Sequence, residues 1–216
     1  MMSPASLLDV SPVIPVVTIG DPDHAVPVAR ALLAGGIGII ALTLRTSRAL
    51  EALALVVAEV PEILVGAGTV LTPQQADDVV AHGARFVVTP GANLRLLQHL
   101  TSLPVPVLPG VATVSEVLTA LDHGFTELKF FPAGPAGGPS YLSAVSAPVP
   151  EARFCPTGGV TPDNMAGYLA LPNVPTVGGS WLTPDSLVSS RNWTQVTALA
   201  DEARHRARRS ASDDLA

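Results

Sequence analysis

One lysine is placed to act as a nucleophile. The chain has eleven arginines but a single lysine, Lys129, which lies in the apolar segment Glu127–Phe131. Strand alternation puts Lys129 and Phe131 on one face, and burial there lowers the pKa of the amine and favours its neutral form. A neutral amine attacks carbonyl carbons to form a Schiff base. The alternative is a strand-end lysine that pairs with Glu127.

Two glycine pairs end late apolar runs, in Thr157-Gly158-Gly159 and in Gly178-Gly179-Ser180. Such turns expose backbone N–H groups, and Thr161 is placed to begin a helix just beyond the first pair. In parallel barrels the seventh and eighth loops often bind phosphate. These pairs therefore predict a phosphate site, although ordinary tight turns use glycine pairs too.

Three other run ends carry groups suited to binding. Arg45 follows Leu42-Thr43-Leu44 and is expected to point into the mouth of a barrel, where it can hold a carboxylate with two hydrogen bonds. Thr69 follows Gly66-Ala67-Gly68 and offers a hydroxyl donor. Pro90 precedes Gly91 at a similar end. A surface arginine and plain strand-to-helix turns remain the alternatives.

Short apolar runs alternate with amphipathic segments along the whole chain. Their near-continuous hydrophobicity is typical of parallel strands that are covered on both faces. Eight strand–helix units in 216 residues predict a compact (β/α)8 barrel, with an open doubly wound sheet as the alternative. The predicted strands are Val13–Ile19, Ile37–Leu44, Ile63–Ala67, Phe86–Thr89, Pro106–Pro109, Glu127–Phe131, Phe154–Thr157 and Thr176–Gly178.

Helix boundaries are marked by capping residues and glycines. A threonine or aspartate followed by proline predicts a helix start. Gly35-Gly36 and Gly83 predict helix ends. We expect one domain over residues 1–216, with residues 204–216 as a frayed tail. The predicted starts are Asp21-Pro22, Thr72-Pro73, Thr113 with Glu116, Thr161-Pro162 and Thr183-Pro184.

Composition argues against several other functions. A net charge of −6 is unlike a nucleic-acid binder, and no apolar run reaches the roughly 18 residues of a membrane span. The beginning of the chain does not resemble a signal peptide, so we expect a cytoplasmic protein. The lone Cys155 excludes an internal disulfide framework. Five histidines are scattered without ligand-type spacing, so no metal is expected.

The motifs together resemble the 2-keto-3-deoxy-6-phosphogluconate (KDPG) / 4-hydroxy-2-oxoglutarate (KHG) aldolases. The likeness runs from about Val13 to Trp181, in the same order and spacing. It rests on Gly-Gly-Ile…Leu-Thr-Leu-Arg-Thr (35–46), Val-Gly-Ala-Gly-Thr-Val (65–70), Pro-Gly (90–91), Leu-Lys-Phe-Phe-Pro (128–132), Phe-Cys-Pro-Thr-Gly-Gly (154–159) and Gly-Gly-Ser-Trp-Leu (178–182).

The resemblance implies a homotrimeric barrel of the class I aldolase type, which needs no cofactor or metal. The reaction it implies is cleavage of KDPG to pyruvate and glyceraldehyde 3-phosphate. Lys129 then forms the Schiff base. The implied substrate-binding residues are Arg45 and Thr69 for the carboxylate, Pro90 and Phe131 for the pocket wall, and Thr157, Gly158, Gly159, Gly179 and Ser180 around the phosphate site.

One position departs from the family pattern. The resemblance implies a glutamate four residues before Arg45 as general acid/base, and Ala41 stands there. Alanine cannot move a proton, and losing one general acid/base typically slows a reaction about 10²–10⁴-fold. The chain is then either a natural weakened or repurposed member or an engineered variant. Water or Glu127 is left to carry the proton.

Two other functions remain open. One is a non-catalytic barrel that binds phosphorylated sugar acids, which would form no covalent adduct with pyruvate. The other is a phosphosugar isomerase, which commonly uses carboxylates or a cysteine at strand ends. Cys155 lies inside the expected seventh strand, two residues before Thr157, and this placement favours a core role.

Overall fold

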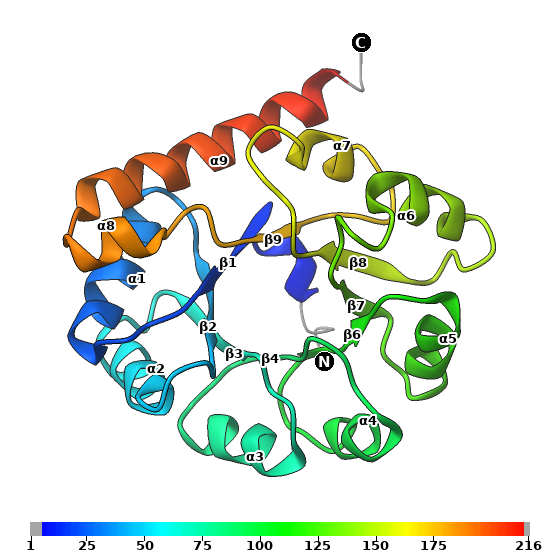
Figure 1. Cartoon of the computed structure of the whole chain (residues 1–216), viewed down its shortest axis with the longest axis horizontal. Helices are drawn as coiled ribbons and strands as arrows, with labels where there is room; N and C mark the ends of the chain where they lie inside the picture. The colour runs from blue at the N-terminus through cyan, green and yellow to red at the C-terminus, as the bar shows by residue number, and fades with distance from the viewer. Residues whose placement is uncertain (1–5, 214–216) are drawn as a thin grey trace.

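The computed structural model describes residues 6–213, and the side chains of residues 6–207. Parallel strands form a central ring, and helices surround it on the outside (Figure 1). This arrangement confirms the predicted (β/α)8 barrel and excludes the open doubly wound sheet. The strands are β1 (Val13–Val17), β2 (Ile39–Thr43), β3 (Leu64–Gly68), β4 (Val87–Val88), β5 (Val107–Leu108), β6 (Gly110–Val111), β7 (Glu127–Phe130), β8 (Arg153–Pro156) and β9 (Val177–Gly179).

Two contacts close the ring between a sheet of order β5-β4-β3-β2-β1-β9 and a sheet of order β6-β7-β8. Pro109 lies between β5 and β6, and its carbonyl accepts a hydrogen bond from the Lys129 N–H at 3.0 Å. Proline has no N–H to donate, and at Pro109 the strand is interrupted: β5 lies within the predicted run 106–109, whereas β6 lies just beyond it. On the other side, Thr157 bridges to Gly178 in parallel register. Each of the eight predicted runs therefore contributes to the ring.

The helices return the chain from the carboxyl end of each strand to the next strand. Two short 3₁₀ helices precede the first of them, η1 (Leu7–Asp9) and η2 (Pro22–His24). The last helix packs across α1, α7 and α8 on the outside of the ring (Figure 1). The helices are α1 (Ala25–Ala34), α2 (Ala49–Glu59), α3 (Pro73–Ala81), α4 (Leu94–Leu100), α5 (Val114–Asp122), α6 (Gly138–Ser146), α7 (Met165–Leu169), α8 (Asp185–Ser189) and α9 (Trp193–Asp213).

Three of the predicted helix starts are confirmed. The Thr113 hydroxyl and the Glu116 carboxylate cap each other's backbone at the start of α5, as a capping box requires. The Thr72 hydroxyl accepts from the Gln75 N–H at the start of α3. The Asp21 side chain caps η2, which leads directly into α1. The glycines that follow α1 and α3 lie at the predicted helix ends.

Two predicted helix starts are wrong. The Thr161 N–H donates to the Asn164 side chain, and the residues between them form a turn, so that α7 begins only at Met165. Helix α8 starts at Asp185 with Pro184 at its N-cap, and the Thr183 hydroxyl is buried without a hydrogen-bond partner among the described residues. A threonine before proline therefore does not cap a helix at either place.

The C-terminal segment contains the end of the last helix. Helix α9 continues to Asp213. Arg204 donates to the Asp201 carboxylate, Arg206 pairs with Glu202, and Ala207 is buried. Residues 214–216 of the predicted tail lie outside the described part of the chain.

Candidate active site

Lys129 lies on β7 with its side chain in the interior of the barrel. The residue is only 6% exposed, and Nζ lies 4.8 Å from the centre of the Phe131 ring. In the register of the sheet, Lys129 stands beside Gly110 of β6 and Cys155 of β8. The strand therefore holds the amine among backbone, apolar and uncharged polar groups, and no carboxylate of the described side chains pairs with it.

This setting makes the amine unusually easy to deprotonate. Burial lowers the pKa of Lys129 to about 8, and the positive charge of Arg45 acts in the same direction, whereas Cys155 opposes the shift. At pH 7 roughly one amine in ten is then neutral, against roughly one in three thousand for an ordinary lysine. A carbonyl group would meet a substantial population of nucleophile.

The rate of imine formation should follow this pKa. With pyruvate as the carbonyl compound, we expect the rate of adduct formation to rise about tenfold per pH unit below pH 8, because only the neutral amine attacks. Above pH 8 the rate should level off. The measurement is the initial rate of borohydride-trapped adduct, determined by mass spectrometry across pH 6–10. A rate that keeps climbing to pH 10 would mean that Lys129 titrates like an exposed lysine.

A cavity opens beside the amine in the middle of the barrel. The cavity is narrow, with a volume of about 20 Å³, and it is partly open to solvent. Neither a carboxylate nor an imidazole is among the described residues that line it. These are Ile14, Val16, Ala41, Thr43, Gly68, Thr69, Val88, Leu108, Lys129, Cys155, Thr157 and Gly178.

Ala41 and Thr43 reach this cavity from β2, as strand alternation predicts. Both are buried, at 3% and 2% exposure. Ala41 stands beside Gly66 of β3, and Thr43 beside Gly68. The position that the resemblance assigns to an acid/base therefore faces the same space as Lys129, but its methyl group has no proton to give.

Thr69 enters the cavity in a strained backbone conformation. Its φ is +62°, in the left-handed region that a β-branched residue rarely adopts. Such a conformation costs on the order of 1–3 kcal/mol, and strain of this kind is concentrated at functional sites. The sequence placed Thr69 at the end of a strand but gave no sign of this strain.

Thr157 and Cys155 form the wall of the cavity on β8 and just beyond it. The Thr157 hydroxyl donates to the Cys155 carbonyl at 3.3 Å. A Cβ on Gly178 would lie 2.2 Å from that hydroxyl, so only glycine leaves room for it. Burial raises the pKa of the Cys155 thiol to about 11, so the thiol stays protonated at neutral pH. This argues against the cysteine-based isomerase chemistry.

Three of the predicted substrate-binding residues do not line the cavity wall. They are Arg45, Phe131 and Pro90. Arg45 is exposed in the turn after β2 and does not line the cavity wall, although its charge acts on Lys129. The Phe131 ring lies near Lys129 Nζ, but Phe131 is not among the residues that line the cavity. The Pro90 backbone packs so closely against Gly110 that a Cβ on Gly110 would lie 2.2 Å from the Pro90 carbonyl carbon. Pro90 does not line the cavity either.

The turn after β8 presents two free amides. Gly158 and Gly159 both have left-handed backbones, with φ of +90° and +83°. Their carbonyls accept hydrogen bonds from the Gly134 N–H at 2.8 Å and from Asn164 Nδ2 at 2.9 Å. Within residues 6–213 neither glycine N–H donates to another backbone group. Free N–H groups in such a turn suit an anion.

Asn164 is a residue of this turn that sequence reasoning missed. Its amide group donates to the Gly159 carbonyl and accepts from the Thr161 N–H at 2.8 Å. The second glycine pair differs from the first, because the Trp181 ring packs against Gly179 and Ser180 is exposed. The sequence signal that could have revealed Asn164 is its position, five residues after Gly159.

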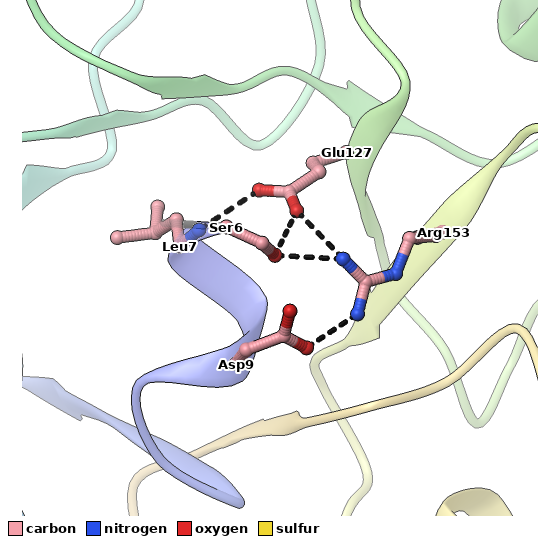
Figure 2. A network of polar contacts seen from close by, with 5 residues as sticks. All are labelled: Ser6, Leu7, Asp9, Glu127 and Arg153. Atoms are coloured by element: carbon pink, nitrogen blue, oxygen red, sulfur yellow. Dashed lines mark hydrogen bonds and ion pairs between the residues drawn. The ribbon is translucent and has the colours of Figure 1, made fainter. Parts of the chain in front are cut away.

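Glu127 lies at the opposite end of the barrel from the cavity mouth. It starts β7, where it accepts hydrogen bonds from Ser6, the Leu7 N–H and Arg153, and Arg153 also pairs with Asp9 (Figure 2). The Arg153 guanidinium lowers the pKa of Asp9. Neither a Lys129–Glu127 pair nor a proton-carrying Glu127 fits this arrangement, so both expectations are wrong.

Comparisons with known proteins identify the family. The family model "KDPG and KHG aldolase" matches residues 5–199. The chain belongs to the KDPG and KHG aldolase family. It is 47% identical to the 2-dehydro-3-deoxy-phosphogluconate aldolase of Dickeya dadantii over 93% of this chain and 94% of that protein. It is 45% identical to the KHG/KDPG aldolase of Escherichia coli, with the same coverage.

Solved KDPG aldolases share the whole barrel. A Legionella pneumophila KDPG aldolase, solved with pyruvate captured as a covalent carbinolamine intermediate, superposes with a TM-score of 0.91 at 46% identity. That match covers 94% of this chain and 98% of the other. The aldolase of Zymomonas mobilis with 3-phosphoglycerate gives 0.85 at 41% identity, over 91% and 92% of the two chains. The predicted KDPG/KHG aldolase fold is thereby confirmed.

Two features are absent from the described part of this KDPG/KHG aldolase family member. In the described part of the chain, no three His, Cys, Asp or Glu side chains cluster in a way that could hold a metal ion. No described helix is long and apolar enough to cross a membrane.

Proposed function

We propose that this chain is a class I aldolase that cleaves KDPG to pyruvate and glyceraldehyde 3-phosphate, and also cleaves 4-hydroxy-2-oxoglutarate. The observation that carries the proposal is the single lysine of the chain, buried in the barrel cavity with a pKa lowered to about 8. Both substrates carry a C2 ketone, which is the group that a neutral amine attacks. Family membership supports the same reaction.

The chemistry follows from Lys129 as nucleophile. Its amine adds to C2 to give a carbinolamine, which loses water to give a protonated imine. The imine nitrogen then draws the electron pair of the C3–C4 bond as the C4 hydroxyl loses its proton, which releases the aldehyde and leaves an enamine. Protonation at C3 and hydrolysis release pyruvate and restore the amine. Because the imine supplies the electron sink, the reaction needs no metal.

The substrate has charged groups at both ends, and we propose a site for each. The Thr69 hydroxyl, in the cavity wall, and Arg45, at the exposed rim, bind the carboxylate, with Phe131 and Pro90 beside it. The opposite end docks on the turn of Gly158 and Gly159, which is supported by their free amides. The other groups proposed for that end are Thr157, Gly179 and Ser180.

Turnover is expected to be slow for a member of this family. Ala41 stands where the resemblance implies a glutamate, and the described cavity lining holds no other carboxylate. Each of the steps of dehydration, cleavage and enamine protonation needs a proton moved. We further propose that the enzyme works as a cytoplasmic homotrimer, as the family resemblance implies.

Pyruvate and borohydride test the function directly. Incubation of the protein with both should add one reduced pyruvate to the mass, on the peptide that contains Lys129, and the same protein should form pyruvate from KDPG. A binding barrel without catalysis would bind KDPG and show neither result. Tight binding of KDPG with no adduct at any pH up to 9 would overturn the aldolase proposal in favour of that binder.

Ser180→Asp should separate the two substrates. A carboxylate at this exposed strand end places a like charge where the phosphate docks, so we expect kcat/KM for KDPG to fall about 100-fold. The unphosphorylated 4-hydroxy-2-oxoglutarate should lose no more than about threefold. The measurement is kcat/KM for both substrates, with Ser180→Asn as the neutral control. Equal losses on both substrates would show that Ser180 is not at the phosphate site.

A further inference from the structure

The chemistry of the cavity leaves the source of the proton open. Its described lining offers Lys129, Cys155 and three threonine hydroxyls as polar side-chain groups. Lys129 becomes the imine, and the Cys155 thiol, with a pKa of about 11, does not ionise at neutral pH. Protons must therefore move through hydroxyl groups and the solvent they contact.

One of the three hydroxyls has a partner that leads out of the cavity. Thr43 Oγ1 lies 2.8 Å from Thr18 Oγ1, and either oxygen can be the donor. Strands β1 and β2 pair with Val17 beside Leu42, so Thr18 and Thr43 follow as neighbours at the mouth of the barrel. Thr43 is 2% exposed and faces the cavity, whereas Thr18 is half-buried beyond the end of its strand.

The other hydroxyls are less suited to passing a proton on. Thr157 already donates to the Cys155 carbonyl, and the Thr69 hydroxyl has no hydrogen-bond partner among the described residues.

The loops that follow β1 and β2 are fixed to each other, because Thr46 Oγ1 donates to the Ile19 carbonyl at 2.7 Å. This contact holds the strand ends that carry Thr18 and Thr43 in place.

We propose that Thr43 and Thr18 form a two-hydroxyl proton relay between the reacting carbons and solvent, an inference that rests on the proposed aldolase function. When the C4–OH loses its proton, Thr43 Oγ1 accepts it while passing its own proton to Thr18 Oγ1, which passes its own to water. In enamine protonation the same chain runs in reverse and delivers a proton to C3. The proton taken from C4–OH equals the proton returned, so each turnover is balanced.

In this scheme Thr43 is a catalytic residue, because it contacts the reacting atoms, and Thr18 is a positioning residue that acts through it. The two oxygens can exchange donor and acceptor roles, as transfer in both directions requires. A hydroxyl is a weak base, so the relay supports only a modest rate of proton transfer, and a carboxylate in the cavity would transfer protons faster.

The test follows the exchange of pyruvate methyl protons with D₂O by NMR, a reaction that needs the imine and proton transfer at C3 but no aldehyde. Imine formation is measured separately by borohydride trapping. We expect Thr43→Val to lower exchange at least tenfold and Thr18→Val about threefold. The amount of adduct trapped after imine formation has reached equilibrium should stay within twofold, because a relay changes the rate of proton transfer and not the stability of the imine. Thr43→Ser, which keeps the hydroxyl, should recover at least half of the rate.

A second background distinguishes a relay from a packing effect. In an Ala41→Glu protein, which has a carboxylate to move the proton, Thr43→Val should lower exchange less than threefold. An equal loss in both backgrounds would overturn the relay, and so would unchanged exchange in Thr43→Val. Absence of trapped adduct in the unsubstituted protein would instead overturn the aldolase function itself.

Thr176→Val is the matched control for the substitution. Thr176 is fully buried on the approach to β9, lies outside the cavity, and its hydroxyl has no hydrogen-bond partner among the described residues. Removing that hydroxyl is expected to leave exchange and trapping within twofold of the unsubstituted protein. A tenfold loss of exchange in this control as well would assign the Thr43→Val effect to general packing and overturn the relay.

Discussion

Replacing Lys129 by alanine should abolish aldol cleavage and leave no pyruvate adduct on the chain. No other ε-amine exists in the sequence to take over the attack on the C2 carbonyl. Without the imine nothing draws electrons from the C3–C4 bond, so we expect kcat to fall by at least about 10⁴-fold, to the background of the assay. The measurements are the rate of pyruvate formation from KDPG and the intact mass after borohydride reduction.

Lys129→Arg is the matched control for charge and size. It keeps a long cationic side chain in the cavity but stays protonated, so it too should form no adduct. Both variants should still bind the substrate, because Lys129 is not among the groups proposed to hold its charged ends. A reduced pyruvate found on either variant, on a residue other than the terminal amine, would refute the Schiff-base role of Lys129.

Ala41→Glu should raise kcat by about 100-fold or more. Ala41 faces the cavity beside Lys129, and a longer side chain there extends into the cavity, because the Phe86 ring fills the space over Gly66, its neighbour on β3. A carboxylate there can move protons far better than a hydroxyl, and one positioned general acid/base is typically worth about 10²–10⁴-fold. KM should change little, because the proposed binding groups are elsewhere.

The pH profile of Ala41→Glu gives a second readout. A carboxylate in the cavity favours protonated lysine and so raises the pKa of Lys129 above its present value of about 8. Rates are therefore best compared at pH 8.5 and above, with Ala41→Gln as the isosteric control that cannot exchange a proton. An unchanged kcat in a folded Ala41→Glu protein would mean that the present chain already has an equally effective proton carrier.

The barrel was predictable because its strands are simple in sequence. Segments such as Ile39–Thr43 are apolar along their whole length, and this pattern marks parallel strands buried on both faces. Helix starts were predictable where the side chain does the capping, as at Thr113. They failed at Thr161, where the following residues form a turn and α7 begins only at Met165.

The site was predictable to the extent that it depends on strand alternation. That rule brought Ala41, Thr43 and Lys129 to one cavity. It could not give the left-handed backbone of Thr69, because strand alternation says nothing about the turn that follows a strand. Nor could it give the partner of Glu127, because the contact with Ser6 joins residues 121 positions apart.

The burial of Lys129 also determines how the chain reacts with amine-reactive small molecules in its surroundings. Reducing sugars, activated esters and cross-linking dialdehydes modify proteins mainly through exposed lysine side chains, and the surface of this chain offers none. Apart from the terminal amine, such reagents have a single target, which lies inside the barrel and is reached only by compounds small enough to enter the cavity. Amine-directed reagents therefore find no ε-amine on the surface of this protein, and the single ε-amine that they can modify is the one that forms the Schiff base.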